Sequence, residues 1–303
     1  MLKVISASRR TDIPAFYSEW FMSRIRAGYV RFVNPFSKAV CRASLRPKDV
    51  AAIVFWSKNY QPLLPHLDEL DAGDYRMLFH FTVNGLPSVF EPNVADVGSL
   101  VECARTLSRR YGSETVLWRY DPVLISSITS SQYHLTQFEK LCGQLEGAIT
   151  KCYFSFTVFH RKVVRNAEIL SNESDIVLYD LPRDDRIELA NALASIASQH
   201  GIQMHSCCGD YLLGEKVKKA YCTDGELLHR LFTDKVGSLE TYPTRNECGC
   251  CQCTDIGAYD TCIHGCVYCY ANSNLHTALR NHQEQDRGRD ILIGNPRPAR
   301  AQA

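Results

Sequence analysis

The stretch Val50-Ala-Ala-Ile-Val-Phe-Trp56 is apolar on both of its alternating faces. A parallel strand that is covered on both sides reads as such a continuous apolar run, whereas a half-exposed strand alternates apolar and polar residues. The stretch therefore predicts a buried strand of a parallel sheet. Similar strand-like segments occur along the chain at 2–8, 75–83, 115–122, 151–158 and 202–206.

Segments with helical periodicity separate these strands, and the alternation predicts an α/β fold. Helices are expected over 15–27, 97–111, 132–147, 184–200 and 212–234, and a loop or short hairpin over 31–36. Six strand–helix units without a G-x-G-x-x-G turn favour a partial (β/α)6 TIM-like barrel over a dinucleotide-binding sheet. We expect this barrel over residues 1–240. A cysteine-rich segment, 241–275, would close its mouth, and 276–303 would be a tail that is disordered past Gly294.

The composition indicates a soluble protein of a reducing compartment. Of the 303 residues, 45% are hydrophobic and 22% are charged, and the net charge of +1 provides no global attraction to a polyanion. The N-terminus has no signal-peptide pattern, and no apolar run is as long as a membrane span. Seven of the 14 cysteines fall within 248–269, which is too crowded for a disulfide framework. A cytoplasmic protein without membrane attachment is therefore predicted.

Three cysteines, Cys262, Cys266 and Cys269, form a C-x3-C-x2-C pattern within one short segment. Three thiolates this close can each bind one iron of a cubane iron–sulfur cluster and leave the fourth iron open. Zinc is the alternative, although zinc ribbons usually show C-x2-C pairs and need a fourth protein ligand. His264, between the first two cysteines, would either hydrogen-bond a cluster sulfur or shape the turn with Gly265.

Polar residues follow several predicted strands, at the end where α/β barrels place their chemistry. The candidates for binding a cofactor or substrate are Arg9, Arg10, Asp12, Lys58, Asn59, Arg119 and Asp121. Asp12 could instead cap the following helix, and Lys58 could be a solvated loop residue. Arg119 and Asp121 lie two apart on an extended chain and so face the same side, as either an ion pair or a ligand-binding pair.

A second group of cysteines lies upstream, in Cys248-Gly-Cys250-Cys251-Gln-Cys253. This density exceeds the needs of one site, and Cys207 and Cys222 also lack partners. We predict that Cys207, Cys222, Cys248 and Cys250 could bind a second [4Fe-4S] cluster, with zinc or no metal as the alternatives. The other scattered cysteines, Cys41, Cys103, Cys142 and Cys152, have apolar neighbours and are expected in the core.

The C-x3-C-x2-C spacing resembles that of the radical S-adenosylmethionine (SAM) enzymes, and the string Cys262-x-His-Gly-Cys-x-Tyr-Cys-Tyr270 is most similar to their spore photoproduct lyase branch. The whole chain resembles the domain of unknown function 1848 family, whose C-terminal cysteine cluster is like that of radical SAM enzymes. The strings that carry this resemblance are 6–14, 55–59, 118–122, 255–259 and the cysteine segment. In most radical SAM enzymes the cluster segment follows the first strand, whereas here it follows six. The resemblance thus implies a permuted order, with 255–259 as an additional strand or an extended connection.

The resemblance implies a specific chemistry. Cys262, Cys266 and Cys269 would hold a [4Fe-4S] cluster whose open iron binds SAM, and Tyr268 would pack near the adenine. Reductive cleavage of SAM would give a 5′-deoxyadenosyl radical that acts on an unknown substrate, with flavodoxin or ferredoxin as electron donor. Repair of DNA photoproducts is not favoured, because no basic stripe interleaved with aromatic residues occurs. The rival expectation is a non-catalytic zinc- or iron–sulfur-binding module with a redox-sensing or nucleic-acid-binding role.

Overall fold

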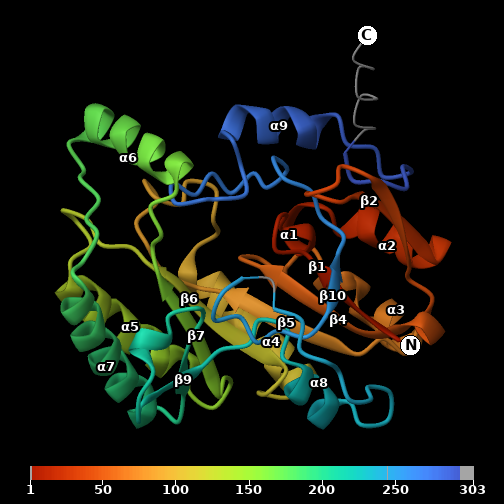
Figure 1. The fold of residues 1–303 in the computed structure, drawn as a ribbon, viewed down its shortest axis with the longest axis horizontal. Helices are drawn as coiled ribbons and strands as arrows, with labels where there is room; N and C mark the ends of the chain where they lie inside the picture. The colour runs from red at the N-terminus through yellow and green to blue at the C-terminus, as the bar shows by residue number, and fades with distance from the viewer. Residues whose placement is uncertain (1, 244, 294–303) are drawn as a thin grey trace.

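The computed structural model describes residues 2–243 and 245–293, and its centre is one parallel sheet of eight strands (Figure 1). The strands are β1 (Lys3–Ala7), β4 (Val50–Ser57), β5 (Met77–Thr82), β6 (Val116–Val123), β7 (Lys151–Phe156), β8 (Gln203–Ser206), β9 (Val217–Lys219) and β10 (Cys253–Asp255). They lie in the order β10-β1-β4-β5-β6-β7-β8-β9, and every neighbouring pair is parallel. The predicted α/β class and all six predicted strands are confirmed.

The last strand, β10, reverses the direction in which the sheet grows. From β1 to β9 each new strand is added on one side, and then β10 returns to the opposite edge and pairs with β1 through Ser6 and Asp255. A strand was one of the two expectations for 255–259, but the observed strand lies earlier in the chain and shares only Asp255 with that range. Because parallel strands end at the same edge of a sheet, the segment after β10 emerges beside the ends of β1 and β4.

Five helices cover one face of the sheet: α2 (Ser18–Ala27), α3 (Leu67–Ala72), α4 (Val97–Tyr111), α5 (Ser131–Leu145) and α7 (Arg183–Gln199). Their apolar side chains pack against Phe55, Phe79 and Trp118, which point to this face. Two of these helices begin at a capping residue: Asp96 and Ser130 accept hydrogen bonds from the backbone of α4 and α5. This layer is the main core of the protein.

The opposite face of the sheet is covered by the segment between β8 and β10. Val54, Leu78 and Leu117 of the sheet form a second buried cluster with side chains from 207–251, including Leu228 of α8 (Gly225–Leu231). Figure 1 shows this segment, drawn in green-blue to light blue, crossing in front of the strands. Most of the second cysteine group therefore lies inside the fold.

The prediction of helical segments over 212–234, with Cys222 between two of them, is wrong for the first segment and confirmed for the second. The structure has a 3-10 helix, η3 (Asp210–Leu212), then strand β9, and only then the helix α8. Val217–Lys219 pairs with β8, and this pairing of backbone groups outweighs the local helical preference. A helix to which the sequence gave no assignment, α6 (Arg161–Ser174), follows β7.

The remaining elements are α1 (Ile13–Phe16), the hairpin β2 (Tyr29–Val33) and β3 (Val40–Ser44), the 3-10 helices η1 (Pro47–Asp49) and η2 (Leu64–His66), and α9 (Leu275–Gln283). The hairpin confirms the expectation for 31–36. The chain after α9 returns to α2, where Trp20 Nε1 donates to the Arg289 carbonyl at 2.9 Å. Disorder was predicted past Gly294, which lies outside the described residues. Within 2–243 and 245–293, none of the helices has the length and apolarity needed to cross a membrane.

Candidate functional site

The cysteine loop, defined here as residues 262–269, lies against the polar residues that follow β1, β4 and β5. These three strands lead into Asp12, Lys58 and Glu91, and each of these side chains contacts the loop or a partner of the loop. On its other side the loop meets α6, where Asn166 Nδ2 donates to the Val267 carbonyl at 2.9 Å. Figure 1 shows α6 and α9 along the same side of the molecule, at the top of the view.

Asp255, the last residue of β10, fixes the start of the loop. Its carboxylate accepts hydrogen bonds from Ser6 Oγ at 2.9 Å, Ser8 Oγ at 2.6 Å and Arg10 Nε at 3.1 Å, and also from the Arg9 backbone N–H. A buried carboxylate needs this number of donors to offset the loss of water. Arg10, predicted as a ligand-binding residue, is thus engaged in holding β10 beside β1.

Asp12 has the helix-capping role that the sequence offered as one alternative, and it also contacts the cysteine loop. Its Oδ1 caps α1 by accepting from Ala15 N at 3.0 Å and also accepts from Ser57 Oγ at 2.6 Å. Its Oδ2 accepts from Lys58 N at 2.8 Å and lies 2.7 Å from His264 Nε2. The residue therefore ties the cysteine loop to the ends of β1 and β4.

A buried ion pair supports the aromatic residue of the loop. Lys58 Nζ lies 2.7 Å from Glu91 Oε1, and the same carboxylate oxygen accepts from the Tyr268 hydroxyl. Asn84 Nδ2 donates to this oxygen at 3.2 Å. The Lys58 and Glu91 side chains are only 12% and 4% exposed, so the pair is desolvated as well as close. Lys58 is therefore a buried partner of the loop and not a solvated lysine.

Burial controls the protonation of the three loop cysteines. It raises the pKa of Cys262 well above its usual value and also raises that of Cys269. It raises the pKa of Cys266 to about 12, although the positive charge of Lys58 opposes this shift. The thiols therefore hold their protons at neutral pH, and a metal that binds them would have to displace those protons.

The turn between the first two loop cysteines depends on a glycine. Gly265 has φ +74°, and a Cβ there would lie 2.9 Å from Pro92 Cγ, so this turn requires glycine. In the described ranges no three His, Cys, Asp or Glu side chains are arranged to hold one metal ion. A cubane cluster takes each thiolate at a different iron, so its ligands need not surround a single point. Three thiols on one short loop fit this requirement of a cluster.

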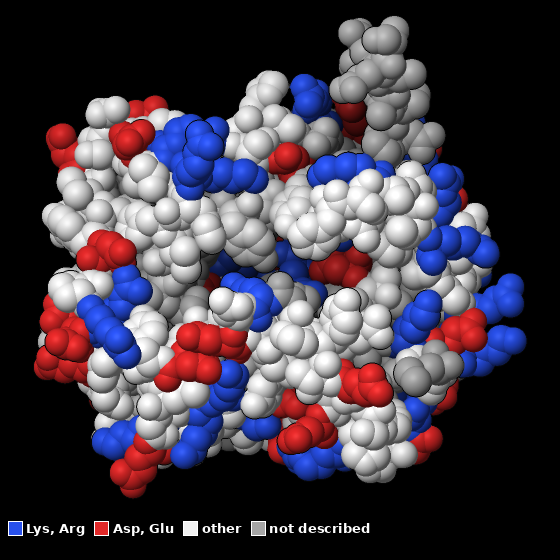
Figure 2. Space-filling view, in the orientation of Figure 1, with Lys and Arg blue, Asp and Glu red and all other residues white. Residues whose placement is uncertain are grey.

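Arg119 and Asp121 form the ion pair that the sequence suggested, next to a second predicted arginine. The guanidinium groups of Arg119 and Arg9 lie 5.4 and 5.9 Å from the ring centre of Trp56, which stacks on His80 at 4.0 Å. Figure 2 shows a hollow near the middle of one face, with basic and acidic atoms at its floor. Charged groups in such a depression can bind a polar ligand.

The four cysteines predicted as a second group come together. Cys207 Sγ and Cys222 Sγ are 3.1 Å apart, and side-chain hydrogen bonds join Cys222 to Cys250 and Cys250 to Cys248. Cys208, which the sequence analysis did not single out, hydrogen-bonds Cys207. We call these five residues the inner cysteine group.

One predicted residue, Asn59, shapes a turn, and three residues of the two cysteine regions were not predicted. Asn59 accepts from Gln61 N at 3.0 Å, which shapes the turn after β4. Glu91, Asp255 and Arg245 were not selected as site residues. Glu91 follows β5 within ten residues, so the strand-end rule could have found it, whereas no sequence signal marks Arg245.

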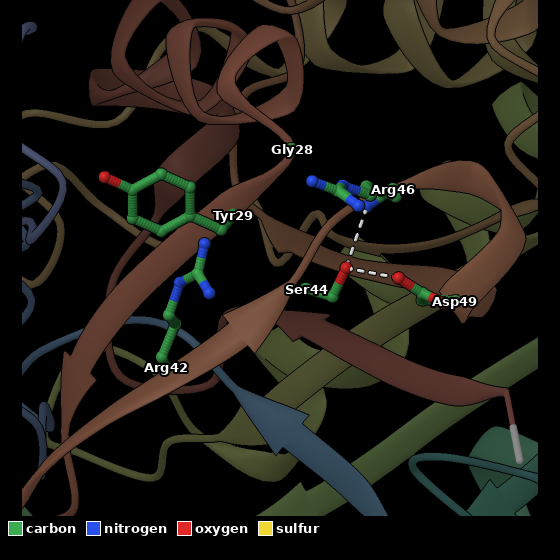
Figure 3. Close-up of a pocket in the computed structure, with 6 residues that line it drawn as sticks. All are labelled: Gly28, Tyr29, Arg42, Ser44, Arg46 and Asp49. Carbon is green, nitrogen blue, oxygen red and sulfur yellow. Dashed lines mark hydrogen bonds between the residues drawn. The ribbon is translucent and has the colours of Figure 1, made fainter.

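A pocket of about 470 Å³ lies at the β2–β3 hairpin (Figure 3). Its lining comprises Gly28, Tyr29, Arg42, Ser44, Arg46 and Asp49. Ser44 Oγ donates to Asp49 at 2.6 Å, and the Arg42 guanidinium lies 4.2 Å from the Tyr29 ring centre. Its polar groups thus partner one another, and none of the sequence-predicted site residues lines it.

Two comparisons bear on the identity of the chain. A search of curated proteins finds no match. The sequence profile described as "Domain of unknown function (DUF1848)" matches residues 4–271, which include every strand from β4 to β10, nearly all of β1 and the whole cysteine loop. The chain belongs to this family.

Proposed function

We propose that the protein is a radical SAM enzyme whose cysteine loop holds a [4Fe-4S] cluster through Cys262, Cys266 and Cys269. The observation that carries the proposal is the position of the loop. It follows an edge strand of a parallel sheet and is hydrogen-bonded to residues at the ends of the next strands, through His264–Asp12 and Tyr268–Glu91. Active sites of α/β barrels lie at this end of the strands.

The strand order supports the resemblance to radical SAM enzymes. Although the cysteine loop comes last in sequence, it follows β10, which lies at the edge of the sheet next to β1. In space the loop therefore follows the first strand of the series β10-β1-β4-β5-β6-β7, as in the radical SAM arrangement. We interpret these six strands as an open (β/α)6 barrel, to which β8 and β9 are added.

When bound, the reduced cluster would cleave SAM and supply a 5′-deoxyadenosyl radical that abstracts hydrogen from the substrate. The residues of this chain would hold and shield that site. Lys58 and Glu91 fix the Tyr268 ring, and Asp12 fixes His264, so the loop keeps one conformation. Arg9 and Arg119, on the face of Trp56, provide positive charge for anionic groups of SAM or the substrate. The three loop cysteines are only partly exposed, which would limit access of water.

The rival proposal is a non-catalytic metal-binding module. It shares the cysteine ligands but needs neither SAM nor a strand-end pocket. Formation of 5′-deoxyadenosine by the anaerobically reconstituted, dithionite-reduced protein distinguishes the two proposals. We expect 5′-deoxyadenosine from the wild-type chain and none from a variant with all three loop cysteines changed to alanine. An iron-loaded wild-type protein that leaves SAM intact would contradict the enzyme proposal.

A further inference from the structure

The inner cysteine group is assembled from three separate parts of the chain. Cys207 and Cys208 follow β8, Cys222 follows β9, and Cys248 and Cys250 precede β10. Cys207, Cys222 and Cys250 are 7%, 8% and 3% exposed, so these three sulfurs meet in the interior on the face of the sheet that the other helices leave open. Chance packing of small apolar residues does not explain why five cysteines from these segments contact one another.

Close approach of the backbone makes this assembly feasible. Gly249 separates Cys248 from Cys250, and a Cβ at this position would lie 2.1 Å from the ring of Tyr221, the residue before Cys222. Thr223 on the other side donates its N–H to Cys250 Sγ at 3.5 Å. The segments around Cys222 and Cys250 are thus fitted to each other, and only glycine allows the contact.

Arginine side chains contact sulfurs of the inner cysteine group and of the nearby Cys253. Arg245 Nε lies 3.0 Å from Cys208 Sγ and its Nη2 lies 3.5 Å from Cys207 Sγ. Arg119 Nη1 lies 3.8 Å from Cys222 Sγ, and Arg9 Nη2 lies 3.3 Å from Cys253 Sγ. Arginine is always charged and is a hydrogen-bond donor only, so these contacts favour sulfurs that carry negative charge.

Arg245 gives the most direct indication that these sulfurs carry negative charge. Arg9 and Arg119 have the carboxylates of Asp255 and Asp121 as partners. Arg245 forms no ion pair with a carboxylate in the part of the chain that the structure describes, and the acceptors recorded for its guanidinium are the two sulfurs. Metal-bound cysteines are thiolates, so a metal–thiolate centre supplies the missing negative charge.

We propose that Cys207, Cys222, Cys248 and Cys250 ligate a second iron–sulfur cluster, and that Arg245 is a positioning residue that compensates its charge. Zinc is the alternative metal, and it fits less well because the spacing Cys248-x-Cys250 is shorter than the C-x2–4-C pairs of zinc sites.

The inference does not rest on the proposed SAM chemistry and is tested without SAM. The test protein carries Cys262→Ala, Cys266→Ala and Cys269→Ala together, so only the inner cysteine group can bind a cluster. After anaerobic reconstitution we expect about four iron and four sulfide per chain, roughly half the content of the wild-type protein. Adding Cys222→Ala and Cys250→Ala should remove this iron, whereas adding Cys41→Ser, on the β3 strand far from both groups in sequence, should not.

Two outcomes would overturn the proposal: zinc as the only tightly bound metal, or a folded triple variant that binds no metal. Circular dichroism establishes folding in each case. Cys222 and Cys250 are buried, so their loss can also disturb folding, and Arg245 provides a second test that spares every ligand. Arg245→Gln should shift the reduction potential of the cluster to a more negative value, and Arg245→Lys should restore most of it. An unchanged potential in Arg245→Gln would refute the role of Arg245.

Discussion

The two cysteine groups of this protein are built in opposite ways. The cysteine loop contains three sulfurs within eight consecutive residues. Its His264 contacts the Asp12 carboxylate, and the Lys58–Glu91 pair lies beside it. The inner cysteine group draws five sulfurs from three distant segments and is surrounded by arginines. A local motif can present an open site at the strand ends, whereas a site made by tertiary contacts is enclosed by the fold.

The comparison predicts different consequences of losing a cysteine. Cys266→Ala, in the loop, should leave the fold intact and reduce 5′-deoxyadenosine formation by more than about 100-fold, since ligand loss exceeds the effect of losing a supporting residue. Product analysis after anaerobic incubation with SAM and dithionite measures this. Cys41→Ser, outside both groups, is the control and should retain activity. Cleavage of SAM by Cys266→Ala at the wild-type rate would show that the loop takes no part in SAM cleavage.

Breaking the buried ion pair between Lys58 and Glu91 should strongly destabilise the folded state. Lys58→Met leaves the Glu91 carboxylate buried without its cation and should reduce the free energy of unfolding by about 3–5 kcal/mol. The double variant Lys58→Met/Glu91→Gln should recover part of this loss, because no uncompensated charge remains. Urea unfolding gives both values. Arg26→Ala, which breaks the exposed pair with Glu69, is the matched control and should cost less than about 1 kcal/mol. Equal losses at the two pairs would contradict the burial argument.

The stability lost on replacing Lys58 should depend on pH in a defined direction. Burial acts to lower the pKa of Lys58, but the negative charge of Glu91 and the hydrogen bond to it act to raise the pKa, and the net shift is upward. A group whose pKa is higher in the folded state contributes its full stability below its unfolded pKa and loses it as pH rises through the folded value. We therefore expect the difference in unfolding free energy between wild type and Lys58→Met to persist at neutral pH and to shrink only in strongly alkaline buffer. A difference that disappears on acidification from neutral pH to pH about 6 would contradict this assignment.

Replacing Asp12 should affect metal retention at the cysteine loop and not at the inner cysteine group. Asp12→Asn keeps the size of the side chain but removes the charge that faces His264, and should weaken metal retention at the loop by about 10–100-fold. Iron release to a chelator, followed in the wild type and in the variant lacking the three loop cysteines, separates the two groups. The inner group should release iron at an unchanged rate when Asp12→Asn is added, and acceleration there would show that the groups are coupled.

The smallest expected effect concerns the turn of the loop. Gly265→Ala places a Cβ on a residue with φ +74° and close to Pro92, and should cost somewhat more than the roughly 1–2 kcal/mol of left-handed strain alone. Gly147→Ala is the matched control, because its φ is +73° and nothing lies within 4 Å of the added Cβ. Thermal unfolding compares the two variants. Equal costs would show that the contact with Pro92 does not hold the loop.

The sequence predicted the elements whose signals are local. Apolar runs such as 50–56 predicted six strands, and a cap was one of the two roles considered for Asp12 because N-cap chemistry acts over three residues. β9 was missed because three residues carry too little pattern and form a strand only by pairing with β8. The same reasoning explains the site. The cysteine loop is readable from its spacing, and the inner group was predicted only by counting cysteines without partners, whereas Arg245 reaches its sulfurs through tertiary structure alone.

The central claim is that the cysteine loop binds a cluster that SAM can reach. Electron paramagnetic resonance of the anaerobically reconstituted and reduced protein, recorded with and without SAM, tests it directly. The account predicts a reduced-cluster signal that changes when SAM is added, and no such change in the variant lacking Cys262, Cys266 and Cys269. A wild-type signal that is identical in the presence and absence of SAM would contradict the account.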